Sequence, residues 1–482
     1  MALALATTAA GCAAGPAFRR PNAPQAVRYS TAPSSVPTAA LLADGGAQRV
    51  VESAFVDASW WRTLGAPSLD TLIAQSLRAN PTLAAAEATL RQAEQVFAAQ
   101  SGSSQFPVVD GTATGQRQRF NPATLGQAGE PREFTLLNAS VSVRYKLDLA
   151  GGNRRALEAL AARADYRRYQ LAGARLTLAA NVANTAIAQA RLAAQVEGME
   201  AMLQVEDEQL GLSRERLRLG AASPDEVLTA TLRTEQSRSA VPSQRKLHEQ
   251  NAHLLAVLAG REPGAGGLPA FALADFTLPS ELPLVVPSEL VRRRPDVQAA
   301  EALLRAANAE YGVAVAKLFP QLNLSASLGS QALSSGALFG AGSAIYALVG
   351  QLTQPLLNPG LPAEKRAALA AFEAAAANYQ GVVLEALRNV ADVLRALDND
   401  AQTVAALAGA DAAAQGALAS VERQYALGAA SYVQVLGARA QAHQVRQSLD
   451  AARAQRLSDS VALFQAVGGG GEPVAAREPK TP

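Results

Sequence analysis

Two stretches of the chain alternate between apolar and polar residues, which is the pattern of a β-strand with one apolar and one polar face. Apolar side chains occupy every second position from Ala139 to Leu147, and again from Leu322 to Leu328. Two less regular partners, at about 108–120 and 342–357, complete two predicted strand pairs. Each strand is long enough for the roughly 9–11 residues of a tilted transmembrane strand. The same alternation also fits a soluble hairpin with one wet face.

Two much longer segments, 153–219 and 363–427, contain no proline and are dense in Ala, Leu, Gln, Glu and Arg. At about 1.5 Å per residue, each segment spans roughly 100 Å as a helix. Helices of globular proteins average about 11–12 residues, so these segments have the length of coiled-coil helices.

Each long helix is predicted to end in a tight turn, because Gly220 and Gly428 tolerate the left-handed conformation found after a helix C-terminus. Ser223 and Ser431 are suitable N-caps for return helices, which we expect at about 224–260 and 432–467. Pro242 is expected to interrupt and kink the first return helix. The sequence thus predicts two long helical hairpins.

These elements recur because the chain is a tandem repeat. The sequence LGAAS at 219–223 returns at 427–431, and Phe-Pro at 106–107 returns at 319–320. The landmarks keep their order, so two halves of about 210 residues share one plan. Four predicted strands cannot close a barrel, since bacterial barrels have at least about eight. If the strands cross a membrane, several chains must share one barrel.

The composition supports long, closely packed helices more than bulky globular cores. Of the 482 residues, 49% are hydrophobic and only 5% are aromatic, and much of the apolar content is Ala, the best helix former. The formal net charge of +2 excludes a strongly cationic nucleic-acid binder, and the apolar content excludes bulk disorder. No window of 18 or more consecutive apolar residues occurs, so we expect no transmembrane helix.

The single cysteine, Cys12, follows small residues, as the cysteine of a bacterial lipoprotein signal does. We expect residues 1–11 to be the remainder of a signal peptide and Cys12 to be the lipidation site. The alternative is an incidental cysteine at a disordered start. Residues 12–54 are predicted to form an extended strap, and residues 468–482 a disordered tail.

Motifs for catalysis are absent from the sequence. His248 and His253 are five residues apart, which places them about 140° apart on a helix, whereas a zinc motif needs a spacing of four. The chain has no GxSxG, no P-loop and no CxxC motif. We therefore predict no enzymatic activity, no cofactor and no metal site.

Four segments resemble the outer-membrane efflux channels, in the NodT-type branch of the TolC/OprM-like group. LVRRRPDVQAAE at 290–301 resembles the family's LLxRRPDIxxAE signature, and LFPQLNLSA at 318–326 resembles its entry into a strand. WWR at 60–62 and YKLDLAG at 145–151 resemble the family's N-terminal opening and the start of its long helix. The resemblance covers roughly residues 55–470 in register.

The resemblance implies a mainly α fold with transmembrane β-strands. Three chains would form a long α-helical barrel and share a 12-stranded β-barrel, with four strands and two tandem repeats per chain. The first repeat would span 55–262, with strands at about 107–149 and a hairpin at about 150–262. After a linker at 263–280, the second repeat would span 281–467, with strands at about 320–357 and a hairpin at about 360–467.

The implied function is a passive outer-membrane channel of a tripartite efflux system, lipid-anchored and spanning the periplasm of a Gram-negative bacterium. The implied partners are two further copies in a homotrimer, a periplasmic adaptor (membrane fusion protein), an inner-membrane pump of the RND type and outer-membrane lipid, with no nucleic acid. The alternatives are a periplasmic helical-hairpin adaptor or scaffold, and an outer-membrane duct for protein secretion.

The implied sites lie at the hairpin ends. The two adaptor-facing tips would comprise Gly220, Ala221, Ala222 and Ser223, and Gly428, Ala429, Ala430 and Ser431. The family's periplasmic gate often carries an Asp and an Arg just after the second tip, but here those positions are Gly437 and Ala440. We therefore expect an apolar ring near Val433, or the acidic pair of the first tip, to close the channel. The gate candidates are Tyr432, Val433, Leu436, Gly437, Asp225 and Glu226.

Overall fold

The computed structural model describes residues 14–22, 24, 28–29, 48–52, 56–126 and 128–470. Cys12 and the residues from 471 onward lie outside the described residues. The chain forms two compact units, of which the first comprises 1–21, 89–168 and 299–380, and the second 22–88, 169–298 and 381–482. Each unit takes segments from both halves of the chain, so the units do not coincide with the sequence repeats.

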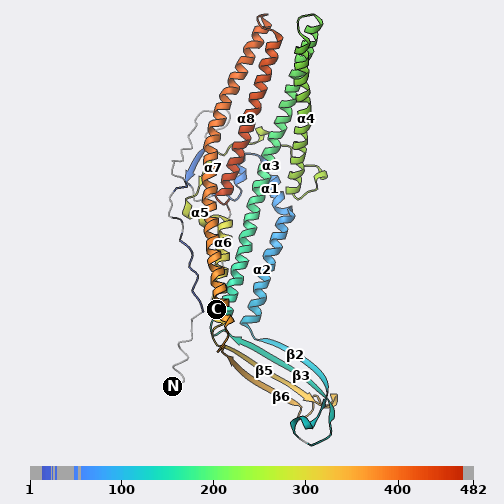
Figure 1. The fold of residues 1–482 in the computed structure, drawn as a ribbon, viewed down its shortest axis with the longest axis vertical. Helices are drawn as coiled ribbons and strands as arrows, with labels where there is room; N and C mark the ends of the chain where they lie inside the picture. The colour runs from blue at the N-terminus through green and yellow to red at the C-terminus, as the bar shows by residue number, and fades with distance from the viewer. Residues whose placement is uncertain are drawn as a thin grey trace. The chain divides into compact units, whose positions relative to one another are not determined.

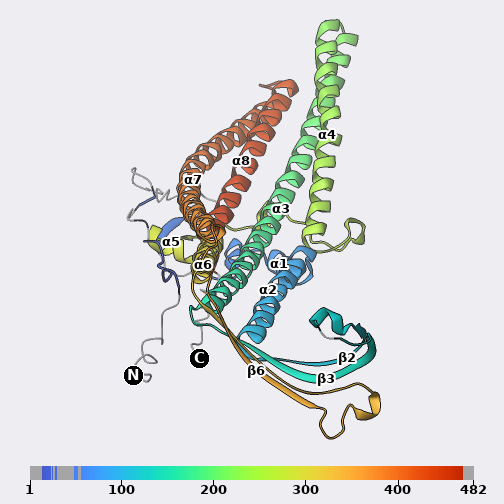
Figure 2. The same cartoon turned by 60° about the horizontal axis from the view of Figure 1, so that its bottom comes forward.

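The first unit contains a four-stranded antiparallel sheet in the order β2-β3-β5-β6. The strands are β2 (Val108–Phe120), β3 (Arg132–Leu147), β5 (Gln321–Ala332) and β6 (Ala344–Thr353), drawn as neighbouring arrows in Figure 1. The first strand pair comes from the first half of the chain and the second pair from the second half, joined through β3 and β5. Figure 2 shows that the sheet is curved along its strands.

The strand register gives this sheet an apolar band on one face. Val109, Val143, Ala326 and Leu348 form one rung across the four strands. The next rung consists of Gly111, Val141, Leu328 and Tyr346. Leu348 and Tyr346 are 82% and 87% exposed in the chain. The opposite face carries polar residues on β2, β3 and β5, such as the aligned Asp110, Ser142 and Ser327.

The helices of the two halves have matching lengths. Helix α3 (Gly152–Arg218) and helix α7 (Gly360–Ala426) each have 67 residues, and their return helices α4 (Pro224–Leu258) and α8 (Tyr432–Ala466) each have 35. Hydrogen bonds from Asn251 to the Thr185 carbonyl and from Arg446 to Asp411 join the helices of each hairpin. The predicted interruption at Pro242 is wrong, because α4 continues through it.

Short elements complete the core of the second unit. These are α1 (Pro67–Ala79), α5 (Pro287–Arg293), the 3₁₀ helix Trp60–Leu64, and the parallel strands β1 (Arg49–Glu52) and β4 (Glu281–Leu284). The two strands are absent from the sequence predictions. Trp60 is 1% exposed and stacks on Phe464 of α8, with 5.2 Å between ring centroids. This aromatic pair joins the beginning of the first repeat to the end of the second repeat.

The remaining helices are α2 (Pro81–Gln105) and α6 (Pro295–Ala316), and short 3₁₀ segments lie at Pro122–Leu125, Pro263–Ala265, Leu273–Asp275 and Ser335–Ala337. Among the described residues one helix, α7, is long and apolar enough to cross a membrane by length and composition. This differs from the expectation of no such segment, because the Ala-rich sequence of α7 is apolar without forming one unbroken run.

Candidate functional site

The two hairpin tips, residues 219–223 and 427–431, have the same backbone structure. Gly220 and Gly428 adopt φ values of 74° and 75°. The residue after each glycine donates to a carbonyl of the last helical turn, from Ala221 to Arg216 at 2.7 Å and from Ala429 to Gln424 at 2.8 Å. These bonds satisfy carbonyl groups that a helix C-terminus leaves without partners. The repeated LGAAS sequence therefore encodes a repeated turn.

The serine of each tip caps the return helix. The Ser223 hydroxyl accepts a hydrogen bond from the Glu226 amide at 3.2 Å, and the Ser431 hydroxyl accepts one from the Gln434 amide at 3.4 Å. The Gln434 side chain accepts in return from the Ser431 amide at 2.7 Å, which completes a capping box. Ala221, Ala222, Ala429 and Ala430 complete the two turns. The turns present small side chains beside the exposed Leu219 and Leu427 at the ends of both hairpins.

Tyr432 links the two hairpins within the second unit. Its hydroxyl donates a 2.7 Å hydrogen bond to the Glu208 carboxylate on α3, and this bond raises the pKa of Tyr432. The Tyr432 ring also lies 5.5 Å from the Tyr425 ring of α7. The first residue of α8 is therefore held by both α3 and α7.

The other gate candidates occupy different environments. Val433 is 42% exposed, whereas Leu436 is fully buried within the chain. A Cβ atom at Gly437 would meet no atom within 4 Å. At the first tip Glu226 forms a 3.5 Å ion pair with Arg216, and Asp225 is exposed. The structure thus brings Tyr432 against α3 and leaves Val433 and Asp225 on the surface of the chain.

Gly198 lies at a second close approach between the hairpins. A Cβ atom there would lie 2.7 Å from Nε2 and 3.0 Å from Cγ of Gln447 on α8. Such distances are shorter than ordinary packing contacts allow, so a side chain at position 198 would require Gln447 to move. Neither Gly198 nor Glu208 can be recognised from the sequence, since each meets a residue more than 200 positions away and no local motif marks it.

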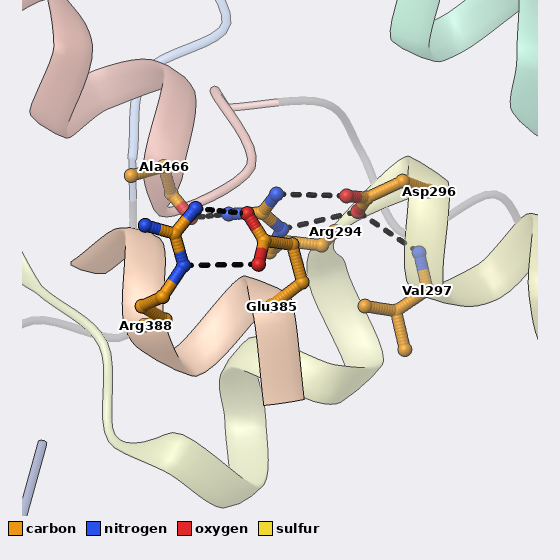
Figure 3. Close-up of polar contacts among 6 residues, drawn as sticks. All are labelled: Arg294, Asp296, Val297, Glu385, Arg388 and Ala466. Carbon is orange, nitrogen blue, oxygen red and sulfur yellow. Dashed lines mark hydrogen bonds and ion pairs between the residues drawn. The ribbon is translucent and has the colours of Figure 1, made fainter. Parts of the chain in front are cut away.

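The RRRPD motif has a structural role that the geometry explains (Figure 3). Arg294 donates to the Ala466 carbonyl at the end of α8 at 2.8 Å, and to both Asp296 carboxylate oxygens at 3.0 and 2.7 Å. Asp296 in turn accepts from the Val297 amide at 2.9 Å. A cation at the C-terminus of a helix also interacts favourably with the helix dipole. Arg294 therefore fastens the start of α6 to the end of α8.

The first repeat has an equivalent contact. Asn80, like Arg294, directly precedes the proline that starts a helix, and it donates to the Leu258 carbonyl at the end of α4 at 3.0 Å. The Asn80 side-chain oxygen accepts from the Thr82 amide at 2.9 Å. The two halves thus use different side chains for one structural task.

Within the first unit, residues 14–16 pack against the start of α3. Arg155 is buried and donates to the carbonyl groups of Ala14, Gly15 and Pro16 at 3.0–3.2 Å. The Ala14 amide donates to the Ala150 carbonyl at 2.8 Å. Gly312 allows the close approach, because a Cβ atom there would lie 2.9 Å from the Arg155 side chain and 3.0 Å from the Ala14 carbonyl oxygen. These contacts hold residues 14–16 against the start of α3.

Ligand chemistry is limited in the part of the chain that the structure describes. Within those residues no group of three or more His, Cys, Asp or Glu side chains is placed to hold a metal ion. The distinctive features are instead an exposed apolar sheet face, two small-residue tips and the contacts between the hairpins. Such features suit a conduit or an assembly surface better than a reaction site.

Comparison with known proteins gives consistent matches over most of the chain. A family model described as "Outer membrane efflux protein" matches residues 72–261 and 286–469. The chain is 30% identical over 481 residues to the probable efflux pump outer membrane protein TtgC of Pseudomonas putida, covering 97% of this chain and 95% of TtgC. It is 33% identical over 432 residues to the pyoverdine export outer membrane protein OpmQ of Pseudomonas aeruginosa, covering 85% and 87%. The fold is similar to the Campylobacter jejuni CmeC outer membrane channel, with a TM-score of 0.84, 19% identity and 96% of each chain covered.

Proposed function

Because the chain belongs to the outer membrane efflux protein family, we propose that three copies assemble into one channel with a shared β-barrel. Membership makes the protein an outer-membrane channel of an efflux pump in a Gram-negative bacterium, and not an enzyme. It also sets aside the periplasmic adaptor as an alternative. The number of copies, the partners and the cargo belong to the proposal.

The observation that carries the proposal is the exposed apolar band on one face of the β2-β3-β5-β6 sheet. An exposed apolar surface of this kind is unfavourable in water and favourable against lipid. The sheet has β2 and β6 at its edges, and its antiparallel order lets β6 of one copy pair with β2 of the next. Three copies then give 12 strands, an even number as in bacterial outer-membrane barrels.

The hairpins then form the periplasmic part of the channel, and the two tips face an adaptor. Small residues at the tips support this assignment, since they permit the close approach of a partner helix. The pump that supplies the energy is proposed to be of the RND type. Relatives named for the export of antibiotics, toluene and pyoverdine favour small organic molecules as cargo over secreted proteins.

The Tyr432–Glu208 bond supports a closing role for the start of α8, with Val433 exposed beside it as the apolar element of the gate.

Lipidation of Cys12 is supported by the docking of residues 14–16 beside Ala150, which lies between β3 and α3. Metabolic labelling with palmitate tests this assignment, since a Cys12→Ala variant is expected to lose the label.

Membrane fractionation tests the proposed assembly. We expect the protein in the outer-membrane fraction, migrating on a gel as a trimer that heating converts to the monomer. A soluble monomer in the periplasm would overturn the proposal.

We also propose that the chain arose by duplication of one hairpin-bearing module. The two copies are the repeats 55–262 and 281–467, which the segment 263–280 joins.

A further inference from the structure

Two arginine side chains lie on the face of the sheet that carries the apolar band, beyond the end of that band. Successive side chains of a strand point to opposite faces, so Arg117 and Arg119 of β2 share the face of Val109. In the register of the sheet they stand opposite Thr135 and Glu133 of β3. This is the end of the two strands where a loop joins them, whereas α2 precedes β2 and α3 follows β3 at the other end.

The positive charge of these arginines exceeds the negative charge beside them. Nη2 of Arg117 donates to the Glu133 carboxylate at 3.1 Å, and 76% of the Arg117 side chain is exposed. Arg119 is also exposed, and its guanidinium group forms no hydrogen bond or ion pair with the residues that the structure describes. Two cations therefore share one carboxylate, and Arg119 is available to an anion from outside the chain.

The length of the apolar band fixes the level of the two arginines. On β3 the band runs from Leu137 to Leu147, and none of the positions aligned with it on the same face of the other strands carries a charged side chain. At about 3.4 Å per residue this stretch is roughly 34 Å long. A strand tilt of about 45° reduces it to roughly 24 Å, close to the apolar height of about 25 Å in outer-membrane barrels. Arg117 follows the last rung of the band, so it lies where the lipid headgroups begin.

A neighbouring copy does not supply the missing anion. Strand β2 is an edge of the sheet, and in the proposed barrel it pairs with β6 of the next copy. The segment 321–353, which includes β5, β6 and their connecting loop, contains no Asp or Glu. Pairing through β6 therefore brings no carboxylate from this segment to Arg119. The phosphate groups of membrane lipids are the anions that remain at this level.

From this placement we propose that Arg117 and Arg119 bind the phosphate groups of an anionic lipid headgroup in the outer leaflet of the membrane. The guanidinium group matches the geometry of phosphate and binds it through paired hydrogen bonds. The long aliphatic part of each arginine covers apolar surface while the charged end reaches the headgroups. Glu133 orients Arg117, and Arg119 contributes the charge that has no partner within the chain. The inference rests on the proposed channel function, because it requires the apolar band to lie in lipid.

Binding of bisphosphorylated lipid A to the purified full-length protein in detergent tests the site, with native mass spectrometry as the readout. We expect the double variant Arg117→Gln/Arg119→Gln to bind this lipid at least about tenfold more weakly than the unmodified protein, since it loses charge-assisted hydrogen bonds. Arg144→Gln is the matched control, because Arg144 is an exposed arginine on the opposite face of β3, and its binding should be unchanged. Equal binding by the double variant and the unmodified protein would overturn the proposal.

Two further arms identify the chemistry that is recognised. Lipid A from which the phosphate groups have been removed is expected to bind the unmodified protein as weakly as bisphosphorylated lipid A binds the double variant, and equal binding of the two lipids would exclude phosphate recognition. Excess inorganic phosphate should leave the bound lipid in place. Displacement of the lipid by inorganic phosphate would show a site for free phosphate and contradict the lipid as its occupant.

Membrane fractionation of the same proteins separates this inference from the channel function. We expect the unmodified protein and both variants to be heat-modifiable trimers in the outer membrane, since exposed glutamines disturb no packing. An unmodified protein that is a soluble monomer would contradict the channel function itself. An outer-membrane trimer whose lipid binding is the same with and without the two arginines would contradict the phosphate site alone.

Discussion

The hydroxyl group of Tyr432, the first residue of α8, donates a 2.7 Å hydrogen bond to the Glu208 carboxylate on α3. The two residues are 224 positions apart, and the bond joins the second hairpin to the first beside a tip. Any separation of the hairpins at this level must break it. The bond is therefore a natural place to look for control of the channel.

Removing this bond is expected to favour the open state. Tyr432→Phe keeps the ring contact with Tyr425 and deletes only the donor to Glu208, so we expect a several-fold higher resting conductance in planar bilayers. Tyr425→Phe is the matched control, because it removes a hydroxyl group at the same level without touching the bond to Glu208. Equal conductance of Tyr432→Phe and the unmodified channel would show that the bond has no role in closure.

A larger side chain between α3 and α8 is also expected to raise the resting conductance, because it separates the two helices. Gly198→Leu places a side chain where even a Cβ atom would lie 2.7 Å from Gln447, so the helices must separate or Gln447 must move. We expect raised conductance that a second substitution, Gln447→Ala, partly reverses. Gly211→Leu is the control, since a Cβ atom there meets nothing within 4 Å. Raised conductance in both glycine variants would point to a general loss of helix packing.

The contact of Arg294 with the end of α8 predicts a loss of stability. Arg294→Ala removes donors to the Ala466 carbonyl and to Asp296, and we expect it to lower the free energy of unfolding by roughly 1–3 kcal/mol. Asn80→Ala, the equivalent change in the first repeat, removes one neutral donor and is expected to cost roughly 0.5–1.5 kcal/mol. Denaturant unfolding in detergent measures both. A larger effect for Asn80→Ala would contradict this ranking.

The docking of residues 14–16 predicts protection from proteolysis. Gly312→Val would push against Arg155 and the Ala14 carbonyl, so the three hydrogen bonds from Arg155 should be lost. At roughly 0.5–1.5 kcal/mol each, their loss should speed trypsin cleavage after Arg19 by at least about tenfold. Gly381→Val is the control, since its Cβ position is open. An unchanged cleavage rate in Gly312→Val would show that docking does not depend on this contact.

The main architecture follows from local patterns in the sequence. The structure confirms the two long helices predicted from the proline-free Ala-rich segments, each of 67 residues. It also confirms that the repeated LGAAS sequence forms two equivalent turns. Period-2 alternation correctly located β3 and β5. The order of the strands in the sheet, β3 beside β5, required the structure because it joins the two halves of the chain.

The contacts that matter for closure could not be predicted in the same way. Glu208 and Gly198 resemble many other residues of α3, and only the approach of α8 distinguishes them. Strands β1 and β4 have four residues each and pair across about 230 positions, so neither shows a periodic pattern. Pro242 does not interrupt α4, because a long helix packed along a partner tolerates the loss of one backbone hydrogen bond, although proline disfavours a helix interior.

Single-channel recording of the purified protein in planar bilayers decides whether three copies form a channel that the Tyr432–Glu208 bond helps to close. We expect discrete conductance steps from a heat-modifiable trimer, with larger steps or longer openings in Tyr432→Phe. A protein that purifies from the outer membrane as a trimer but gives no conductance, in the unmodified form or in Tyr432→Phe and Gly198→Leu, would contradict this expectation.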